Sequence, residues 1–132
     1  MARLTLRIDF DADRQIGPGK IKLLELIDST GSISAAGRQM GMSYRRAWLL
    51  VDNLNRCFRE PVVTAQPGGK EGGGAALTPF GRDLVGSYRA IVAEATAATE
   101  TRVQALEASL RSSSRAGMTR KLSPRAASSR RG

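Results

Sequence analysis

The chain contains no histidine and a single cysteine, Cys57, and these scarcities exclude several kinds of site. One cysteine cannot form an intrachain disulfide, and the usual structural zinc sites need more cysteine and histidine than this sequence offers. We therefore expect no bound metal and no cofactor. Cys57 is interpreted as a small, partly buried core residue rather than as a redox centre.

A catalytic constellation is also missing from the sequence. There is no histidine to act as a base, and no nucleophile stands in a recognisable relation to one. The acidic residues are scattered over charged helix faces, where solvated surface charge explains them. The sequence therefore predicts that the protein is not an enzyme.

Long apolar runs are absent as well. No segment approaches the roughly 18 consecutive apolar residues that span a membrane. The first ten residues, MARLTLRIDF, alternate in polarity instead of forming a secretory apolar run. We expect a cytoplasmic protein with no membrane partner.

Acidic residues are scarce relative to basic ones, with 12 Asp and Glu against 21 Lys and Arg and a net charge of +9. Residues 112–132 hold six of these cations and none of the acids, which leaves 15 cations and 12 acids in residues 1–111. This tail is rich in Ser, Arg, Ala and Gly, and we expect it to be disordered. Such a tail attracts nucleic-acid phosphates, although anionic membranes and other polyanions would attract it too.

The segment from Gly31 to Phe58 predicts two helices joined by a tight turn at Gly41, Met42 and Ser43. Ser34 is the expected N-cap of a helix over residues 35–40, and Gly41 suits the left-handed conformation that ends it. Ser43 is the expected N-cap of the next helix. One face of that helix is apolar, with spacings of three and four residues, through Ala47, Leu50, Val51, Leu54 and Phe58.

The first turn of this second helix is polar and basic, with Tyr44, Arg45 and Arg46 in succession. A helix-turn-helix that places such side chains in the major groove of DNA has this pattern, with residues 43–58 as the recognition helix. The alternative is an ordinary helical hairpin with solvated arginines. We interpret Trp48 as a half-buried brace for the helix in preference to a base contact.

Residues 62–78 predict a hairpin, because two short β-prone arms flank a glycine-rich loop that carries Lys70. A hairpin that directly follows a recognition helix is the wing of a winged helix. A phosphate-binding Walker loop does not fit, since Lys70 is followed by Glu71 instead of Ser or Thr. A plain flexible hairpin tip remains the alternative.

Three further elements surround these motifs. Alternation over residues 3–10 predicts a strand with Leu4, Leu6, Ile8 and Phe10 facing the core. A helix over residues 20–30 is expected to bury Leu23, Leu24 and Ile27 and to end at Gly31. Thr78 and Pro79 begin a last helix whose core stripe should comprise Phe80, Leu84, Tyr88 and Ile91, with close backbone packing at Gly81 and Gly86.

The apolar pattern of the last helix continues past the point where a small domain could cover it. Its later positions form one seam of a short coiled coil, through Thr99, Val103, Leu106 and Leu110. We predict a dimer contact at Val103, Leu106 and Leu110, with a frayed helix end as the alternative.

The expected fold is mainly α with a small β-hairpin wing, an α+β winged helix-turn-helix with a long C-terminal helix. The predicted domains are a DNA-binding domain over residues 1–95, a helical extension over 96–111 and the basic tail over 112–132.

Two motifs carry a family resemblance, GSISAAGRQMGMSYRRAW from Gly31 to Trp48 and GGKEGGGAALT from Gly68 to Thr78, the latter followed by PFGRDL. Together they resemble the N-terminal DNA-binding domain of the ModE family of molybdate-responsive transcription regulators, whose winged helix is related to that of LysR-type regulators. The resemblance covers roughly residues 15–95.

The resemblance implies a homodimer that binds an inverted repeat in double-stranded DNA, in the nucleoid. It also implies the residues that contact DNA. In the helix-turn-helix they are Ser34, Ser43, Tyr44, Arg45 and Arg46. In the wing they are Lys70, Gly68, Gly69, Gly72 and Gly73. ModE proteins continue into molybdate-binding domains that have no counterpart in this sequence, so we expect no direct molybdate binding. The alternative functions are a winged-helix module for protein contacts and a non-specific DNA-binding protein with a basic tail.

Overall fold

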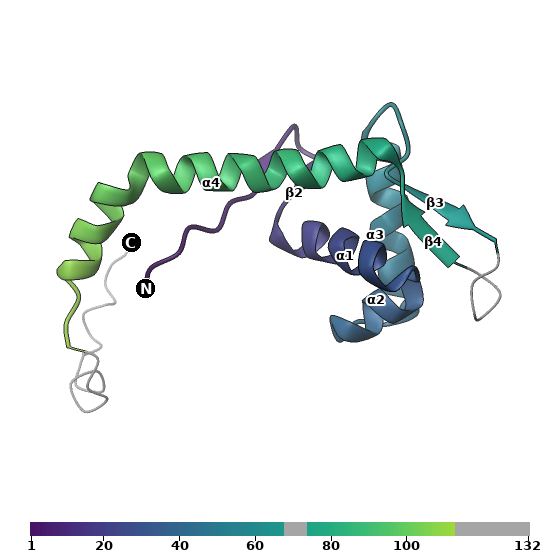
Figure 1. The fold of residues 1–132 in the computed structure, drawn as a ribbon, viewed down its shortest axis with the longest axis horizontal. Helices are drawn as coiled ribbons and strands as arrows, with labels where there is room; N and C mark the ends of the chain where they lie inside the picture. The colour runs from purple at the N-terminus through teal and green to yellow at the C-terminus, as the bar shows by residue number, and fades with distance from the viewer. Residues whose placement is uncertain (68–73, 113–132) are drawn as a thin grey trace. The chain divides into compact units, whose positions relative to one another are not determined.

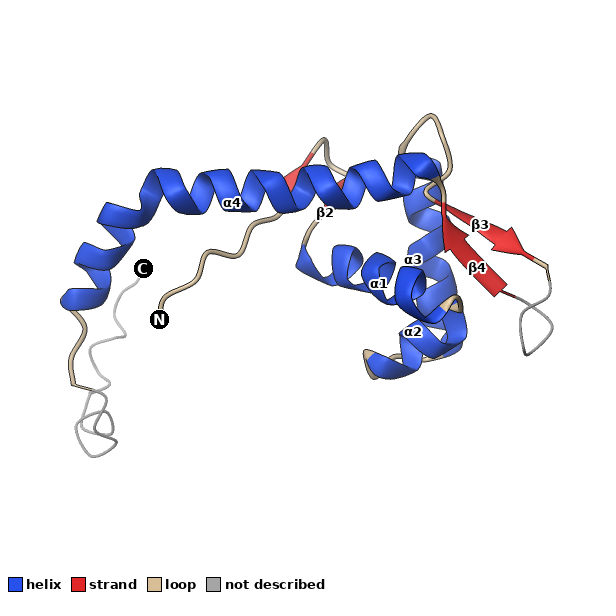
Figure 2. Ribbon diagram, in the orientation of Figure 1, coloured by secondary structure: helices blue, strands red, loops and turns tan. Residues whose placement is uncertain are grey.

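The computed structural model describes residues 1–67 and 74–112 (Figure 1). Helices dominate, and the strands form two small antiparallel pairs (Figure 2), which is compatible with the expected α+β class. Among the described residues there are two compact units, residues 3–98 and residues 1–2 together with residues 99–112. The elements in order are β1 (Ile8–Asp9), β2 (Gln15–Ile16), α1 (Pro18–Thr30), α2 (Ile33–Gln39), α3 (Tyr44–Cys57), β3 (Val63–Gln66), β4 (Gly74–Leu77) and α4 (Pro79–Ala108).

Helix α1 forms the centre of the core in the unit of residues 3–98. The predicted stripe of Leu23, Leu24 and Ile27 is fully buried, and Ile21 joins it. The helix begins at Pro18, two residues before the predicted start, because proline is well suited to the first helical turn, where its missing N–H is not needed. Gly31 ends it in the left-handed conformation, with φ of 72°, as predicted.

The turn between α2 and α3 has the predicted form with one correction. Gly41 has φ of 72°, and the Ser43 hydroxyl accepts the backbone N–H of Arg46, as predicted. The N-cap of α2 is Ser32, not Ser34, because Ser32 is the extended residue whose hydroxyl accepts the N–H of Ala35. Helix α2 therefore begins at Ile33 and ends at Gln39, instead of spanning 35–40.

Helices α2 and α3 pack closely at one glycine. A Cβ atom on Gly37 would lie 2.9 Å from the Cβ of Ala47, a separation that real side chains do not adopt. Glycine at this position lets the two helices approach and fixes the orientation of α3 against α2. The predicted core face of α3 is buried at Ala47, Val51 and Leu54.

The predicted hairpin after α3 is present as β3 and β4, paired antiparallel with Val63 opposite Leu77 (Figure 1). Its second strand is tied to the first helix, since the N–H of Ala75 donates to the carbonyl of Gly31 over 2.9 Å. The hairpin is thereby held beside the end of α1.

Helix α4 begins as predicted, with the Thr78 hydroxyl accepting the N–H of Gly81. Leu84 and Tyr88 are buried, and the Tyr88 hydroxyl donates to the carbonyl of Leu6 over 2.6 Å. Ile91, predicted to be core, is 41% exposed. The packing face of α4 continues from Tyr88 to Val92, four positions on, and Ile91 lies beside that face.

The two glycines of α4 differ in their surroundings. A Cβ on Gly81 would lie 2.2 Å from the carbonyl oxygen of Val62, so the predicted close packing is confirmed there. The same prediction is wrong for Gly86, because a Cβ at that position would meet no atom within 4 Å.

The N-terminal strand is much shorter than the predicted residues 3–10. Its ladder covers only Ile8 and Asp9, because the partner strand ends at Ile16, just before α1 begins at Pro18. The alternation of half-buried and exposed side chains persists through Leu4, Leu6 and Ile8. Phe10 is exposed, contrary to prediction, although its ring packs edge-on against that of Phe58.

In the second unit, α4 ends at Ala108. Leu110 therefore lies beyond the helix, so the predicted helical seam through Leu110 is wrong at its last position. Leu106 is on the helix and strongly exposed, and Val103 is partly buried. The prediction of a disordered tail falls on residues 113–132, which lie outside the described residues.

Candidate nucleic-acid interface

Helix α3 presents three surfaces besides its buried face. Residues three or four positions apart share a helix face, so the face opposite the core carries Arg45, Leu49, Asp52 and Arg56. The side nearer the β3–β4 hairpin carries Tyr44, Trp48 and Asn55. The remaining side carries Arg46, Asn53 and Cys57.

The outward face is cationic at its N-terminal end. Asp52 forms an ion pair with Arg56, with the Arg56 Nη2 3.1 Å from the carboxylate, so this aspartate is already neutralised. Arg45 and Arg46 are exposed, and neither forms an ion pair with another described residue. Since residues 31–58 contain four arginines and one aspartate, the surface around the first turn of α3 favours an anion.

The structure separates the two arginines that the sequence placed together. Arg45 projects from the outward face, one turn before Leu49. Arg46 projects from the side that also carries Asn53. The side-chain oxygen of Asn53 accepts a hydrogen bond from the Lys20 ammonium over 3.2 Å. The two guanidinium groups are therefore suited to different partners.

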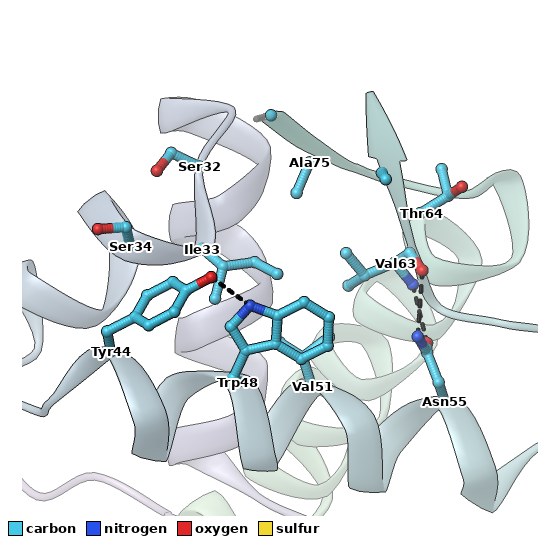
Figure 3. Close-up of a pocket in the computed structure, with 12 residues that line it drawn as sticks. Ser32, Ile33, Ser34, Tyr44, Trp48, Val51, Asn55, Val63, Thr64 and Ala75 are labelled. Carbon is cyan, nitrogen blue, oxygen red and sulfur yellow. Dashed lines mark hydrogen bonds between the residues drawn. The ribbon is translucent and has the colours of Figure 1, made fainter. Parts of the chain in front are cut away.

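Tyr44 and Trp48 form a joined pair on the hairpin side of α3 (Figure 3). The indole Nε1–H donates to the Tyr44 hydroxyl over 2.5 Å. Both rings project from the helix into a groove of about 430 Å³ that separates α3 from the start of α2 and from the hairpin. Trp48 is 45% exposed, and its predicted role as a brace for the helix stays a prediction.

The groove combines apolar side chains with hydroxyl groups. None of the described residues that line it is charged. Ile33, Val51 and Val63 contribute the apolar part, and the hydroxyls belong to Ser32, Ser34, Tyr44 and Thr64. The Ser34 hydroxyl also accepts a hydrogen bond from Arg38 over 2.9 Å, which holds one more guanidinium beside the groove.

Asn55 connects α3 to the hairpin, a role that was not predicted from the sequence. Its side-chain oxygen accepts the backbone N–H groups of Val62 (2.7 Å) and Val63 (3.1 Å), and its amide donates to the carbonyl of Val63 (3.2 Å). These bonds fix the first strand of the hairpin against the helix. An asparagine on a helix near a strand carries no sequence signal that would reveal this contact.

The structure thus places the predicted site residues in four locations. Ser34 and Tyr44 line the groove, Ser43 caps α3, and Arg45 and Arg46 project from different sides of α3. The predicted wing contacts lie outside the described residues, namely Lys70, Gly68, Gly69, Gly72 and Gly73.

Two other features bear on function. Within residues 1–67 and 74–112, no group of three or more His, Cys, Asp or Glu side chains is arranged to hold a metal ion. None of the described helices is long and apolar enough to cross a membrane.

No protein-family model matches the chain. Individual proteins do match, and their names refer to molybdenum. The chain is 52% identical over 79 residues to the molybdenum-pterin-binding protein MopB of Rhodobacter capsulatus, which is 60% of this chain and 29% of that protein. It is 39% identical over 94 residues to the molybdenum transport protein ModE of Azotobacter vinelandii, which is 71% of this chain and 34% of that protein.

A third relative is named for its action on DNA. The chain is 39% identical over 71 residues to the DNA-binding transcriptional dual regulator ModE of Escherichia coli, covering 54% of this chain and 27% of the regulator. The chain spans about a third or less of the length of these relatives. Its homologues are therefore ModE and Mop proteins, and the similarity concerns only part of each of them.

Proposed function

We propose that this chain is a sequence-specific DNA-binding transcription regulator of the ModE type. In the proposal, it binds an inverted-repeat operator as a dimer, with residues 43–58 as the recognition helix and residues 62–78 as the wing. The observation that carries the proposal is the exposed, cationic first turn of α3, which follows a tight turn and precedes a hairpin. This arrangement suits a winged helix-turn-helix, and the names of the ModE relatives point in the same direction.

The two arginines have different roles in this proposal. Arg45, on the outward face, contacts base edges, where a guanidinium can form a bidentate pair with guanine. Arg46, on the side of the helix, contacts a phosphate and positions the protein. The Ser34 and Ser43 hydroxyls and the cationic wing residue Lys70 supply further backbone contacts.

The proposed dimer uses the C-terminal part of α4. Leu106 is an exposed leucine on that helix, and Val103 lies one turn before it on the same face. Replacement of Leu106 by Lys should lower the molecular mass measured by sedimentation at micromolar concentration. Ala105→Lys, which adds the same charge on another face, is the control. An unchanged mass for Leu106→Lys would remove this contact.

The experiment that tests the function is selection of duplexes from a random-sequence library, followed by titration against salt and excess competitor DNA. We expect an inverted repeat that stays bound at moderate salt. Binding that disappears with competitor would leave only electrostatic attraction to DNA, and absence of binding would favour the protein-interaction module. Molybdate is included in one arm, and we expect no effect of molybdate on this chain.

Single alanine variants then test the roles of the arginines. Arg45→Ala should cost about 1–3 kcal/mol for the selected site and relax the preference at one base position. Arg46→Ala should weaken binding to all duplexes and reduce the salt slope by about one. Lys22→Ala, an exposed cation on α1, is the charge-matched control. If both arginine variants bind the selected site as the control does, α3 does not read it.

A further inference from the structure

Three large side chains remain exposed on the N-terminal half of α3. Tyr44 is 57% exposed, Trp48 45% and Leu49 55%, although the same helix buries three other residues completely or nearly so. Isolated exposed apolar residues are normal on a protein surface, whereas neighbouring ones indicate a contact surface. We call Tyr44, Trp48 and Leu49 the apolar patch.

The apolar patch surrounds the arginine to which we assign a base contact. Trp48 and Leu49 lie three and four positions after Arg45, so both are its neighbours on the helix surface. Tyr44 precedes it and shares the groove side with Trp48. Any surface that Arg45 contacts is therefore also within reach of apolar atoms.

The hydrogen bond between Trp48 and Tyr44 determines which contacts the apolar patch can make with a partner. The indole N–H is the only polar group of tryptophan, and the Tyr44 hydroxyl accepts it. The exposed part of Trp48 consequently offers apolar contact alone. Leu49 offers nothing else either. The Tyr44 hydroxyl keeps its own O–H as a donor, and the rest of the patch recognises methyl groups in preference to hydrogen-bonding groups.

Charge decides what kind of molecule this surface fits. Arg45 and Arg46 border the patch, and the one aspartate of residues 31–58 is paired with Arg56. An apolar peptide would meet uncompensated positive charge there. Duplex DNA combines a polyanionic backbone with apolar groups in the major groove, and those groups are the C5 methyls of thymine.

We propose that the apolar patch reads thymine methyl groups in the major groove beside the base contacted by Arg45. The inference rests on the proposed DNA-binding function and adds to it the chemical group that is recognised. It assigns Trp48 and Leu49 a role in sequence preference, and for Trp48 this role replaces the brace that the sequence favoured.

Uracil substitution isolates the methyl group, because uracil keeps the hydrogen-bonding edge of thymine. The probe is the highest-affinity duplex from the library selection, with each thymine replaced by uracil in turn. We expect about fourfold weaker binding at each contacted thymine, from about 0.8 kcal/mol per buried methyl-sized group. Equal affinity for every uracil copy would overturn the inference.

Variants locate the effect on the protein. Each of the variants Trp48→Ala and Leu49→Ala should bind the thymine duplex and one of the uracil duplexes with nearly equal affinity. The position of that uracil identifies the methyl group that the side chain contacts. Ile91→Ala, which removes an exposed apolar side chain from α4, should leave the ratio of thymine to uracil affinity unchanged. Circular dichroism confirms folding, and Leu49→Ala keeps the test valid if Trp48→Ala does not fold, since Leu49 does not line the groove.

The outcomes separate this inference from the proposed function. A selection that yields no preferred sequence overturns both. A preferred sequence with no dependence on thymine methyls overturns only the inference. Variants that weaken thymine and uracil duplexes by the same factor would also overturn it, and would assign the patch to support of the helix or to a protein partner.

Discussion

At the scale of single residues, the site depends on a few side chains that connect elements. Asn55 is the clearest case, because three hydrogen bonds join it to the backbone at the start of β3. Tyr44 and Trp48, both on α3, are joined to each other by a single side-chain hydrogen bond on the side nearer the hairpin. These bonds fix where the hairpin and the exposed rings stand relative to the recognition-helix candidate.

Replacement of Asn55 by Ala should lower the free energy of unfolding by about 1–3 kcal/mol. The reason is that two backbone N–H groups at Val62 and Val63 lose their acceptor in a partly buried place. Urea denaturation measures the loss. Asn53→Ala, an exposed asparagine on the same helix, should change stability by no more than about 0.5 kcal/mol. Equal effects of the two variants would refute the structural role of Asn55.

The two glycines of α4 provide a matched pair. Gly81→Ala should destabilise the fold by about 1–3 kcal/mol, since its Cβ would collide with the carbonyl of Val62. Gly86→Ala should stabilise it by about 0.5–1 kcal/mol, because alanine has the higher helix propensity and the space is open. Thermal unfolding checks both signs. The packing described for α4 would be wrong if Gly81→Ala were neutral.

At the scale of elements, an ion pair connects α1 to α4. The Arg89 guanidinium donates to both carboxylate oxygens of Glu25, over 2.6 and 2.9 Å. Chiefly through this hydrogen bonding, Arg89 lowers the pKa of Glu25 below its ordinary value. A lowered pKa in the folded state means that the pair stabilises the protein only while Glu25 is ionised.

Glu25→Gln should therefore destabilise the protein by about 0.5 kcal/mol at pH 7, a small value because the Arg89 side chain is half exposed. This stabilisation is fully present above the usual glutamate pKa of about 4.3 and is lost as the pH falls through the lower folded-state pKa. Urea denaturation at pH 7, 5 and 3 measures it. The exposed Glu94 on α4 gives the control variant Glu94→Gln. A difference that persists unchanged at pH 3 would contradict this account.

At the scale of the whole molecule, charge is unevenly distributed along the chain. Residues 112–132 contribute six cations and no acid. The sequence-reading residues that we propose lie instead on α3. Affinity for DNA in general and preference for one sequence should therefore be separable by truncation.

Deletion of residues 112–132 should weaken binding to the selected duplex and to competitor DNA alike. Fewer cations displace fewer counterions, so the plot of log affinity against log salt should become less steep. Fluorescence anisotropy between about 50 and 200 mM salt covers the range in which phosphate contacts change affinity strongly. A changed sequence preference after truncation would show that the tail reads bases.

The sequence by itself determined the features that depend on local chemistry. The end of α1 at Gly31, the left-handed Gly41, the caps at Ser43 and Thr78 and the β3–β4 hairpin all follow from the conformational preferences of nearby residues. The apolar period of α3 identified its buried face for the same reason. Residues 31–58 also revealed the basic first turn on which the DNA-binding proposal depends.

Only the tertiary structure decided which surfaces meet. An apolar period cannot show which of its members another element covers, so Phe10 and Ile91 are exposed although both continue a core pattern, whereas Val92 packs against the core. The length of β1 depends on its partner β2, and the alternation over residues 3–10 contains no information about that partner. The groove beside Tyr44 and Trp48 exists because α2, α3 and the hairpin converge there, and Asn55 holds two of them together through bonds between residues that no local pattern relates.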